Sequence, residues 1–334
     1  MDNDVMVIGH DRCQAAVWTL GAALNGLWVP DRKGEMASAV LGFSSLGDRL
    51  AGEDYLGEMV GPFANRIAHG RFQLDGQTFE LEHNDGDNTL HSGDGGLHRQ
   101  TWEVVELGSD RVRLACLWPD GKGGFPGPIR IEVSYRVEGQ TLVHQVWATT
   151  GRPTVVSVVC HPYFNLSGRL EPIHDHELAV AVASYLPVDA ACIPLPEAPA
   201  EATGCFDLRR PSRLESVLAS DHPQIRIAGG LDHAFVLDRP APGHLALAAV
   251  LTHPGSGRRL TIQTDAPALQ IYSGQGLDDD HISHPSGRPG RPGVGLALET
   301  EEFPDAPNRP DFPSAVLRPG QIYHRTTRWA FSVV

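Results

Sequence analysis

The chain has 334 residues, 41 of them acidic and 27 basic, which gives a formal net charge of −14. This acidic balance disfavours nucleic acids and anionic membranes as partners, because both would be repelled at long range. A hydrophobic content of 41% is too high for a disordered chain, and the length allows a large core to be buried.

The N-terminal segment and the cysteines predict the compartment. The opening MDNDVMVIGHD lacks the order of a signal peptide, and no apolar run reaches the roughly 18 residues that span a membrane. The 5 cysteines are scattered, without a Cys-x-x-Cys pair, which is typical of reduced thiols. We therefore expect a cytoplasmic protein without a membrane partner.

Alternation with a period of two dominates the chain and predicts strands. A hairpin is indicated at 71–81 around Asp75-Gly76, and a second one joins 129–137 to 141–148. Further strands are predicted, in chain order, at 15–20, 102–106, 112–118, 154–160, 177–183, 233–237, 245–252, 260–264, 269–272, 294–300 and 326–333. Strands at this spacing indicate a sandwich or barrel.

Helical periodicity is weak, and the best helix is a short one at 212–218 with Ser212 as its N-cap. The 36 glycines and 26 prolines fall between the predicted strands, as the turns of a many-stranded fold require. The richest loop, 284–293, has strand patterns on both sides, so we interpret it as a loop rather than a linker. The prediction is an all-β, mainly antiparallel fold with few short helices, in which 1–334 form one domain.

Residues 293–299, at the predicted strand 294–300, have two unlike faces. One face is apolar, and the other carries only glycine and alanine before Glu299. Small side chains leave space, so we expect another group to lie over this face near Glu299. The plain alternative is a solvated glutamate at the strand end, beside Glu301 and Glu302.

The run from Thr154 to His161 is apolar on both faces, which favours a central strand buried on both sides. Pro162 holds His161 in an extended conformation. A desolvated histidine requires a partner, and that partner is either structural or catalytic.

Three further polar residues stand at loop–strand junctions: Arg66, His91 and Asp232. Each alone is compatible with a surface ion pair or a turn. Together with His161 and Glu299 they fit a polar pocket for a small polyhydroxylated ligand. Tyr272, Trp118 and Phe303 are candidates for its apolar walls, with core packing as the plain alternative.

Metal and nucleotide sites have little support. His174-Asp175-His176 alternates rather than converging on one helix face, and no cysteine–histidine grouping has zinc-like spacing. Neither a Gly-x-Gly-x-x-Gly nor a Walker-type loop is present. We therefore predict no metal and no cofactor.

Several motifs taken together resemble the aldose 1-epimerase (galactose mutarotase) family almost end to end. They lie, in chain order, at 20–31, 40–43, 64–67, 90–91, 161–166, 232–233, 271–274, 298–300, 303–308 and 317–320. The resemblance implies a galactose-mutarotase-like β-supersandwich that interconverts the α and β anomers of free aldoses such as galactose or glucose. The partner would be a monosaccharide, and the enzyme an isomerase without a cofactor, as monomer or homodimer.

The resemblance also implies roles for the site residues. Glu299 would remove the proton of the C1 hydroxyl, and His161 would protonate the ring oxygen. Residues at Arg66, His91 and Asp232 would hold the sugar hydroxyls, and the matching motifs add Asn65 and Tyr272 to the predicted binding residues. An ionised carboxylate and a protonated imidazole would stabilise each other's charge at close range.

Two local departures, Ser92 and Gln275, stand where the family usually has glycine and asparagine, and they concern the sugar preference. Three alternative functions stay open. One is a non-catalytic sugar-binding or sensing protein on the same fold. Another is a glycoside hydrolase or lyase, which requires two flanking carboxylates. The third is a hexose-6-phosphate 1-epimerase, for which Arg288 and Arg291 are the available cations.

Overall fold

The computed structural model describes residues 5–52, 54–237, 244–277 and 292–334. Its largest unit is a nine-stranded sheet in the order β10-β11-β12-β13-β27-β23-β22-β17-β20. In that order its strands are Glu103–Leu107, Arg111–Trp118, Ile129–Glu138, Thr141–Thr150, Tyr323–Val333, Arg258–Thr264, Ala246–Thr252, Glu177–Val180 and Ser212–Arg213. The chain's last strand, β27, therefore lies in the middle of this sheet.

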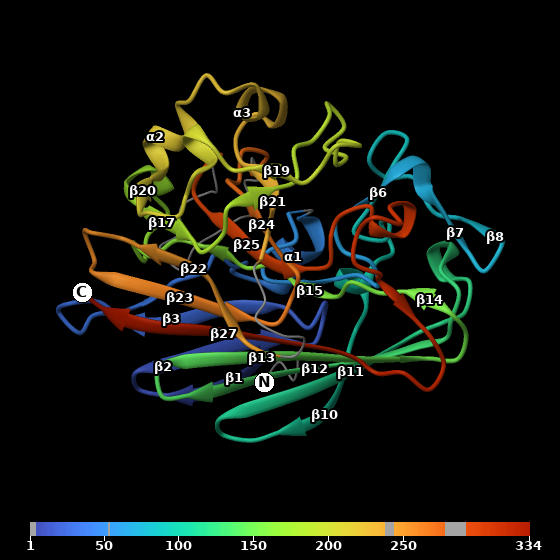
Figure 1. Ribbon diagram of the computed structural model, residues 1–334. Coiled ribbons are helices and arrows are strands. Elements are labelled where there is room, and N and C mark those ends of the chain that lie inside the picture. Colours follow the sequence, from blue (N-terminus) through green and yellow to red (C-terminus); the bar gives the residue numbers. More distant parts are fainter. Residues whose placement is uncertain (1–4, 53, 238–243, 278–291) are drawn as a thin grey trace.

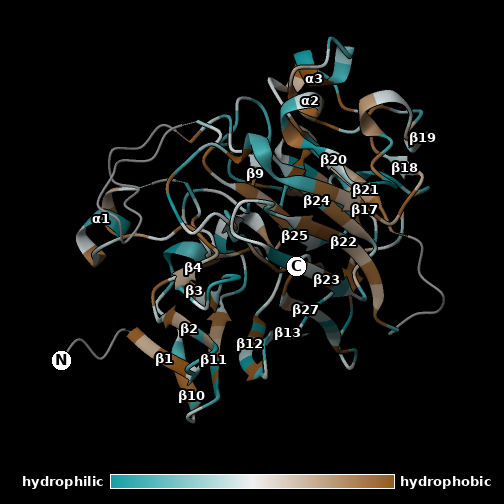
Figure 2. Cartoon of the chain, turned by 90° about the vertical axis from the view of Figure 1, so that its left-hand side faces the viewer, coloured by the Kyte–Doolittle hydropathy of each residue, from teal (hydrophilic) through white to brown (hydrophobic). Residues whose placement is uncertain are grey.

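A six-stranded sheet has the order β16-β25-β24-β21-β18-β19. Its strands are Tyr163–Phe164, Leu296–Glu301, Ala268–Tyr272, Asp232–Val236, Ser184–Tyr185 and Ala200–Glu201. In Figure 1 the long strands of the nine-stranded sheet cross the lower half of the molecule, and β21, β24 and β25 lie above them. Figure 2 shows brown, hydrophobic residues gathered along β22 and β25, and five of the six residues of β25 are buried.

The remaining strands form small sheets around these two. A four-stranded sheet contains β1 (Val5–His10), β2 (Cys13–Trp18), β3 (Leu24–Pro30) and β4 (Met36–Ser38). Two-stranded pairs are β14 (Thr154–Val155) with β26 (Val316–Leu317), β15 (Val159–Cys160) with β5 (Met59–Val60), β6 (Arg66–Ile67) with β9 (Thr89–Leu90), and β7 (Arg71–Leu74) with β8 (Gln77–Glu80).

Helices are few and short. The α-helices are α1 (Leu46–Ala51), α2 (Leu214–Leu218) and α3 (Pro223–Ala228), and α2 and α3 lie at the top of Figure 1. Single 3₁₀ turns occur at Ala68–Gly70, Leu97–Arg99, Lys122–Gly124, Ile173–Asp175, Gly204–Phe206 and Ala306–Asn308. Among the described residues, no helix is long and apolar enough to cross a membrane.

One large core joins the sheets. Alternate residues of β12 are buried, including Ile131, Val133 and Tyr135, and they belong to the same apolar cluster as Leu296 and Leu298 of β25. Period-two alternation in the sequence therefore places one face of each long strand in the core. The mainly antiparallel architecture with few helices confirms the predicted fold class.

Both predicted hairpins are present, as β7/β8 and β12/β13. The predicted single strand at 154–160 is wrong, because the chain changes partners in its middle. Its first part, β14, pairs with β26, and its second part, β15, pairs with β5. Between them the Ser157 N–H donates to the Pro62 carbonyl at 2.8 Å. The segment is buried as expected, but by two separate pairings.

The predicted helix cap is also wrong. The helix begins at Leu214, and Arg213 occupies the N-cap position without a side-chain hydrogen bond. Ser212 belongs to β20, and its hydroxyl donates to the Arg210 carbonyl at 3.2 Å. Strands β1 and β3 and helices α1 and α3 are additional elements that the sequence patterns did not indicate. Of the predicted loop at 284–293, residues 284–291 lie outside the described residues.

The strand before Glu299 has the expected close neighbour. A Cβ atom on Gly295 would lie 2.7 Å from Leu41 Cδ1 and 2.9 Å from Tyr163 Cβ. The small residue therefore allows Tyr163 to approach β25 closely. The alternative of a solvated strand end is wrong, because Glu299, Glu301 and Glu302 are all buried.

Candidate active site

All seven predicted site residues line one cavity of about 200 Å³. They are Asn65, Arg66, His91, His161, Asp232, Tyr272 and Glu299, and Asp54, Tyr55, Leu90, Tyr163 and Gln270 complete the lining. A larger groove of about 760 Å³ follows β7 and residues 306–316 and contains none of the predicted residues. Size alone therefore does not locate the polar site.

Three adjacent strands of the six-stranded sheet bring the polar groups of the cavity floor together. Glu299 of β25 is paired with Gln270 of β24, and Tyr272 of β24 is paired with Asp232 of β21. Because neighbouring strands lie only about 5 Å apart, this register gathers residues far apart in sequence within reach of one small ligand.

Main-chain bonds hold His161 on the other side of the cavity. It follows β15, its N–H donates to the Glu58 carbonyl, and its own carbonyl accepts from the Gly57 N–H, each at 2.9 Å. The ring centroid lies 4.9 Å from that of Tyr163 and 5.5 Å from that of His91. The ring is therefore held by a hydrogen-bonded backbone and by two neighbouring rings.

His161 and Glu299 face each other directly. Nε2 of His161 lies 3.3 Å from Oε1 of Glu299, with the two side chains 4% and 3% exposed. Burial, helped by the charge of Asp232, raises the pKa of Glu299 well above its usual value, and Arg66 only partly opposes this. Burial also lowers the pKa of His161 to about 4.

These shifts differ from the expectation of an ionised pair, because desolvation outweighs the mutual attraction of the charges. Both shifts favour a carboxylic acid at Glu299 beside a neutral imidazole at His161. A carboxylic acid with a neutral imidazole holds the same number of protons as a carboxylate with an imidazolium. The two states differ only in which residue carries the shared proton. The pair can therefore give and take a proton without a change in its total charge.

Arg66 connects two carboxylates at the cavity wall. Its Nε donates to Asp85 Oδ2 at 2.7 Å, and its Nη1 lies 3.5 Å from Asp232 Oδ2. Gln270 Nε2 donates to the other oxygen of Asp232 at 2.5 Å. Burial alone would lower the pKa of Arg66, but the charges of Asp232 and Asp85 raise it above its usual value. The guanidinium thus stays charged and fixed, as a hydroxyl-binding group requires.

His91 is a neutral donor. The Asn65 N–H donates to its Nδ1 at 3.0 Å, which leaves the ring proton on Nε2. Burial, followed by the charges of His161 and Arg66, lowers the pKa of His91 well below its usual value. Asn65 and His91 have φ of 63° and 52°, in the left-handed region that non-glycine residues rarely adopt. Such strain is typical of functional sites.

Five lining residues had not been predicted, among them Tyr55 and Gln270. Tyr55, also left-handed at φ 56°, packs edge-on against His91 with ring centroids 4.7 Å apart. Gln270 is 3% exposed, and its Oε1 is a buried atom without a hydrogen-bond partner among the described residues. A polar residue within the apolar strand Ala268–Tyr272 was a usable signal for Gln270. For Tyr55 the sequence offered none.

The two departures from the family pattern lie outside the cavity lining. The Ser92 hydroxyl donates to the Phe63 carbonyl at 3.0 Å and accepts from the Phe63 N–H at 2.8 Å. Gln275 Nε2 donates to the carbonyls of Ala228 and Leu231 at 2.9 and 3.2 Å. Both side chains therefore brace the backbone and do not contact the cavity.

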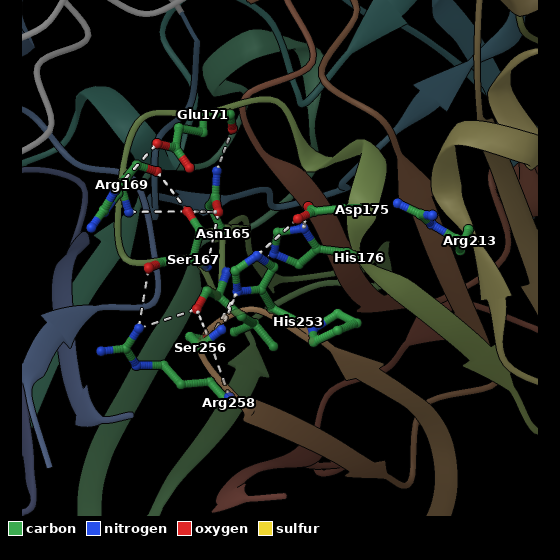
Figure 3. Close-up of polar contacts among 12 residues, drawn as sticks. Asn165, Ser167, Arg169, Glu171, Asp175, His176, Arg213, His253, Ser256 and Arg258 are labelled. Atoms are coloured by element: carbon green, nitrogen blue, oxygen red, sulfur yellow. Dashed lines mark hydrogen bonds and ion pairs between the residues drawn. The ribbon is translucent and has the colours of Figure 1, made fainter. Parts of the chain in front are cut away.

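Asp175, His176 and His253 form the one cluster of possible metal ligands among the described residues (Figure 3). The Leu166 N–H donates to His176 Nε2 at 2.9 Å, and the Ser256 N–H donates to His253 Nδ1 at 3.0 Å. The nitrogens that face Asp175 therefore carry the ring protons. Metal-binding histidines have the reverse arrangement, with the far nitrogen donating. The cluster fits a carboxylate that links two loops better than a metal site.

Comparison with known proteins identifies the family. The family model for aldose 1-epimerase matches residues 4–330. Galactose mutarotase from Sus scrofa is 37% identical over 325 residues, covering 97% of this chain and 92% of its own. Aldose 1-epimerase from Escherichia coli K12 is 34% identical over 320 residues, covering 93% of this chain and 90% of its own.

Solved structures give the same answer. A GalM/aldose epimerase homologue from C. elegans has a TM-score of 0.91 at 27% identity, covering 99% of each chain. Galactose 1-epimerase from Lactobacillus acidophilus has a TM-score of 0.82 at 29% identity, covering 97% of this chain and 92% of its own. On this agreement between motif order, fold and full-length relatives, the chain belongs to the aldose 1-epimerase family.

Proposed function

We propose that the protein is an aldose 1-epimerase that interconverts the α and β anomers of a free aldose such as galactose or glucose. The observation that carries the proposal is the contact of 3.3 Å between His161 Nε2 and Glu299 Oε1 inside a cavity lined by hydroxyl-binding groups. A binding protein needs the donors and acceptors, but not a proton-sharing pair among them.

In the proposed mechanism, the sugar's C1 hydroxyl and ring oxygen replace the direct contact of the pair. A carboxylate at Glu299 takes the C1 hydroxyl proton while His161 gives its proton to the ring oxygen, so the C1–O5 bond breaks and an aldehyde forms. Rotation about C1–C2 presents the other face, and closure returns both protons with the roles reversed. The proton count of the pair is restored, so the cycle needs no proton from solvent. Each group is expected to contribute about 10²–10⁴-fold.

The remaining lining residues would hold the sugar. Arg66 and the Nε2–H of His91 are donors, Asp232 and the free Oε1 of Gln270 are acceptors, and Asn65 and Tyr272 complete the polar wall. Sugar hydroxyls both donate and accept, so a mixed wall suits them.

Charge favours a neutral sugar over a phosphorylated one. Arg66 is the one arginine or lysine in the described cavity lining, and two aspartates already bind it. Arg288 and Arg291, the cations named for a phosphorylated sugar, lie outside the described residues. A phosphate would require at least one further cation. Glycoside hydrolysis is disfavoured because the partner of Glu299 is a histidine, and because Asp232 is held by Arg66 and Gln270.

Polarimetry tests the proposal. Freshly dissolved α-galactose and α-glucose should reach anomeric equilibrium faster with the protein than in buffer, and Glu299→Gln and His161→Asn should remove the acceleration. If the wild-type protein and buffer give equal rates across hexoses and pentoses, the enzyme assignment fails. Binding without acceleration would then favour the sugar-sensing alternative.

The proposal extends to the setting of the enzyme. The 5 cysteines are free thiols, which suits the reducing cytoplasm. The site takes residues from Asp54 to Glu299, which favours one domain over the whole chain. We propose that this unit works as a monomer or homodimer on monosaccharides, without a nucleic-acid or membrane partner.

A further inference from the structure

Glu301 is a second buried carboxyl group on the strand that carries Glu299. The two residues are two positions apart in β25, so their side chains leave the same face of the strand. Glu301 is fully buried, and its Oε1 accepts a hydrogen bond from Asn65 Nδ2 at 3.1 Å. Its Oε2 is buried and has no hydrogen-bond partner among the described residues.

The charged groups that face Glu301 are acidic. Burial raises its pKa well above the usual value, the charges of Glu299, Asp232 and Glu302 add to the effect, and the Asn65 hydrogen bond only partly opposes it. Glu299 has His161 Nε2 within 3.3 Å and Glu302 is paired with Arg325, whereas no cationic side chain of the described residues pairs with Glu301. An isolated buried carboxylate is far more costly than a neutral acid that lacks one hydrogen bond.

Asn65 transmits the position of Glu301 to the sugar-binding residues. While Nδ2 of Asn65 donates to Glu301, its Oδ1 accepts from the Arg66 N–H at 2.8 Å. The Asn65 main-chain N–H donates to His91 Nδ1 at 3.0 Å, from a backbone with φ of 63°. Glu301 therefore fixes the orientation of the carboxamide in a strained turn that carries Arg66 and sets the tautomer of His91.

We propose that Glu301 is a positioning residue that works as a neutral carboxylic acid, holding Asn65 so that Arg66 and His91 face the sugar. The neutral form can still accept the Asn65 hydrogen bond through its carbonyl oxygen, and it places no negative charge beside Glu299, whether Glu299 is a carboxylic acid or a carboxylate. The kinetic part of this inference rests on the proposed epimerase function, whereas the protonation state does not.

Two substitutions test whether Asn65 requires the acceptor oxygen of residue 301 but no negative charge there. Glu301→Gln keeps the acceptor oxygen and the neutrality, so kcat/KM for galactose should stay within about threefold of wild type with an unchanged pH profile. Glu301→Leu leaves the buried Asn65 amide without its acceptor, so kcat/KM should fall about tenfold or more, mainly through KM. Equal losses in both variants, or a pH profile displaced in Glu301→Gln, would overturn the proposal.

Infrared difference spectra report the proton directly and need neither turnover nor the leucine variant. The difference spectrum of wild type minus Glu301→Gln at neutral pH should contain the carbonyl band of a protonated carboxyl group. The matched control is Glu302→Gln, because Glu302 is equally buried but paired with Arg325, and its difference spectrum should contain carboxylate bands instead. Carboxylate bands for Glu301 would refute the neutral acid even if the protein proves not to be an epimerase.

Discussion

Replacement of Gln270 by leucine should weaken the site without disturbing the fold. Gln270 lies in β24 opposite Glu299, and its only side-chain hydrogen bond among the described residues joins Nε2 to Asp232 Oδ1 at 2.5 Å. Leucine has a similar size, and the neighbouring residues of β24 are apolar and buried, so the strand should keep its packing.

The size of the effect follows from the contacts that are lost. A hydrogen bond to a charged group contributes about 1.5–3 kcal/mol. Without it, Asp232 retains the longer contact of 3.5 Å to Arg66 Nη1. The free Oε1 of Gln270, a ready acceptor for a sugar hydroxyl, disappears as well. We expect kcat/KM for galactose to fall by about 10–100-fold, since about 1.4 kcal/mol corresponds to a factor of ten.

Polarimetric initial rates over a series of galactose concentrations measure this change. The matched control is Gln263→Leu, which replaces a half-buried glutamine of β23 that does not line the cavity, and it should leave kcat/KM unaltered. In the background of Asp232→Asn, the Gln270 substitution should cost less than in wild type, because part of its effect acts through Asp232. Wild-type kinetics for Gln270→Leu, or full additivity with Asp232→Asn, would refute the reasoning.

Two predictions concern stability. Burial lowers the pKa of His144 to about 3, so the unfolded chain binds the extra proton first, and stability is lost as the pH falls from about 6.5 towards 3. At pH 5 this group should cost about 2 kcal/mol, and His144→Leu should reduce the pH dependence of urea unfolding by that amount; identical pH dependence would contradict the prediction. Gly295→Ala would set a methyl group against Leu41 and Tyr163, so thermal unfolding should reveal a loss of about 1–3 kcal/mol together with reduced activity. An unchanged melting temperature would show that Tyr163 can move away freely.

Local patterns in the sequence were enough for the long strands and the hairpins. Buried and more exposed residues alternate along β12, because one face of the strand packs on the core along its whole length. The segment at 154–160 shows where such reasoning stops, since continuous burial does not reveal that the partner strand changes at Ser157. Ser212 likewise is a residue type that often caps helices, but here it lies in β20, which pairs with β17.

The predicted site residues came from motif order, and the cavity collects them from strands and loops far apart in the chain. Their protonation did not follow from the sequence, because the shifts of Glu299 and His161 come from desolvation by the assembled fold. Tyr55 and Glu301 were missed because their roles depend on contacts that only the folded chain makes. Each acts through a neighbour more than 30 positions away, and no local pattern records such a contact.

The central place of β27 has a consequence for synthesis on the ribosome. This strand pairs with β13 on one side and β23 on the other, yet it is made after both. Until residues 323–333 emerge, the nine-stranded sheet consists of two parts with unpaired inner edges, and such edges invite pairing between nascent chains. The large sheet can therefore close only after β27 has been made, and chaperones that shield strand edges should affect the yield of this enzyme more than its final stability.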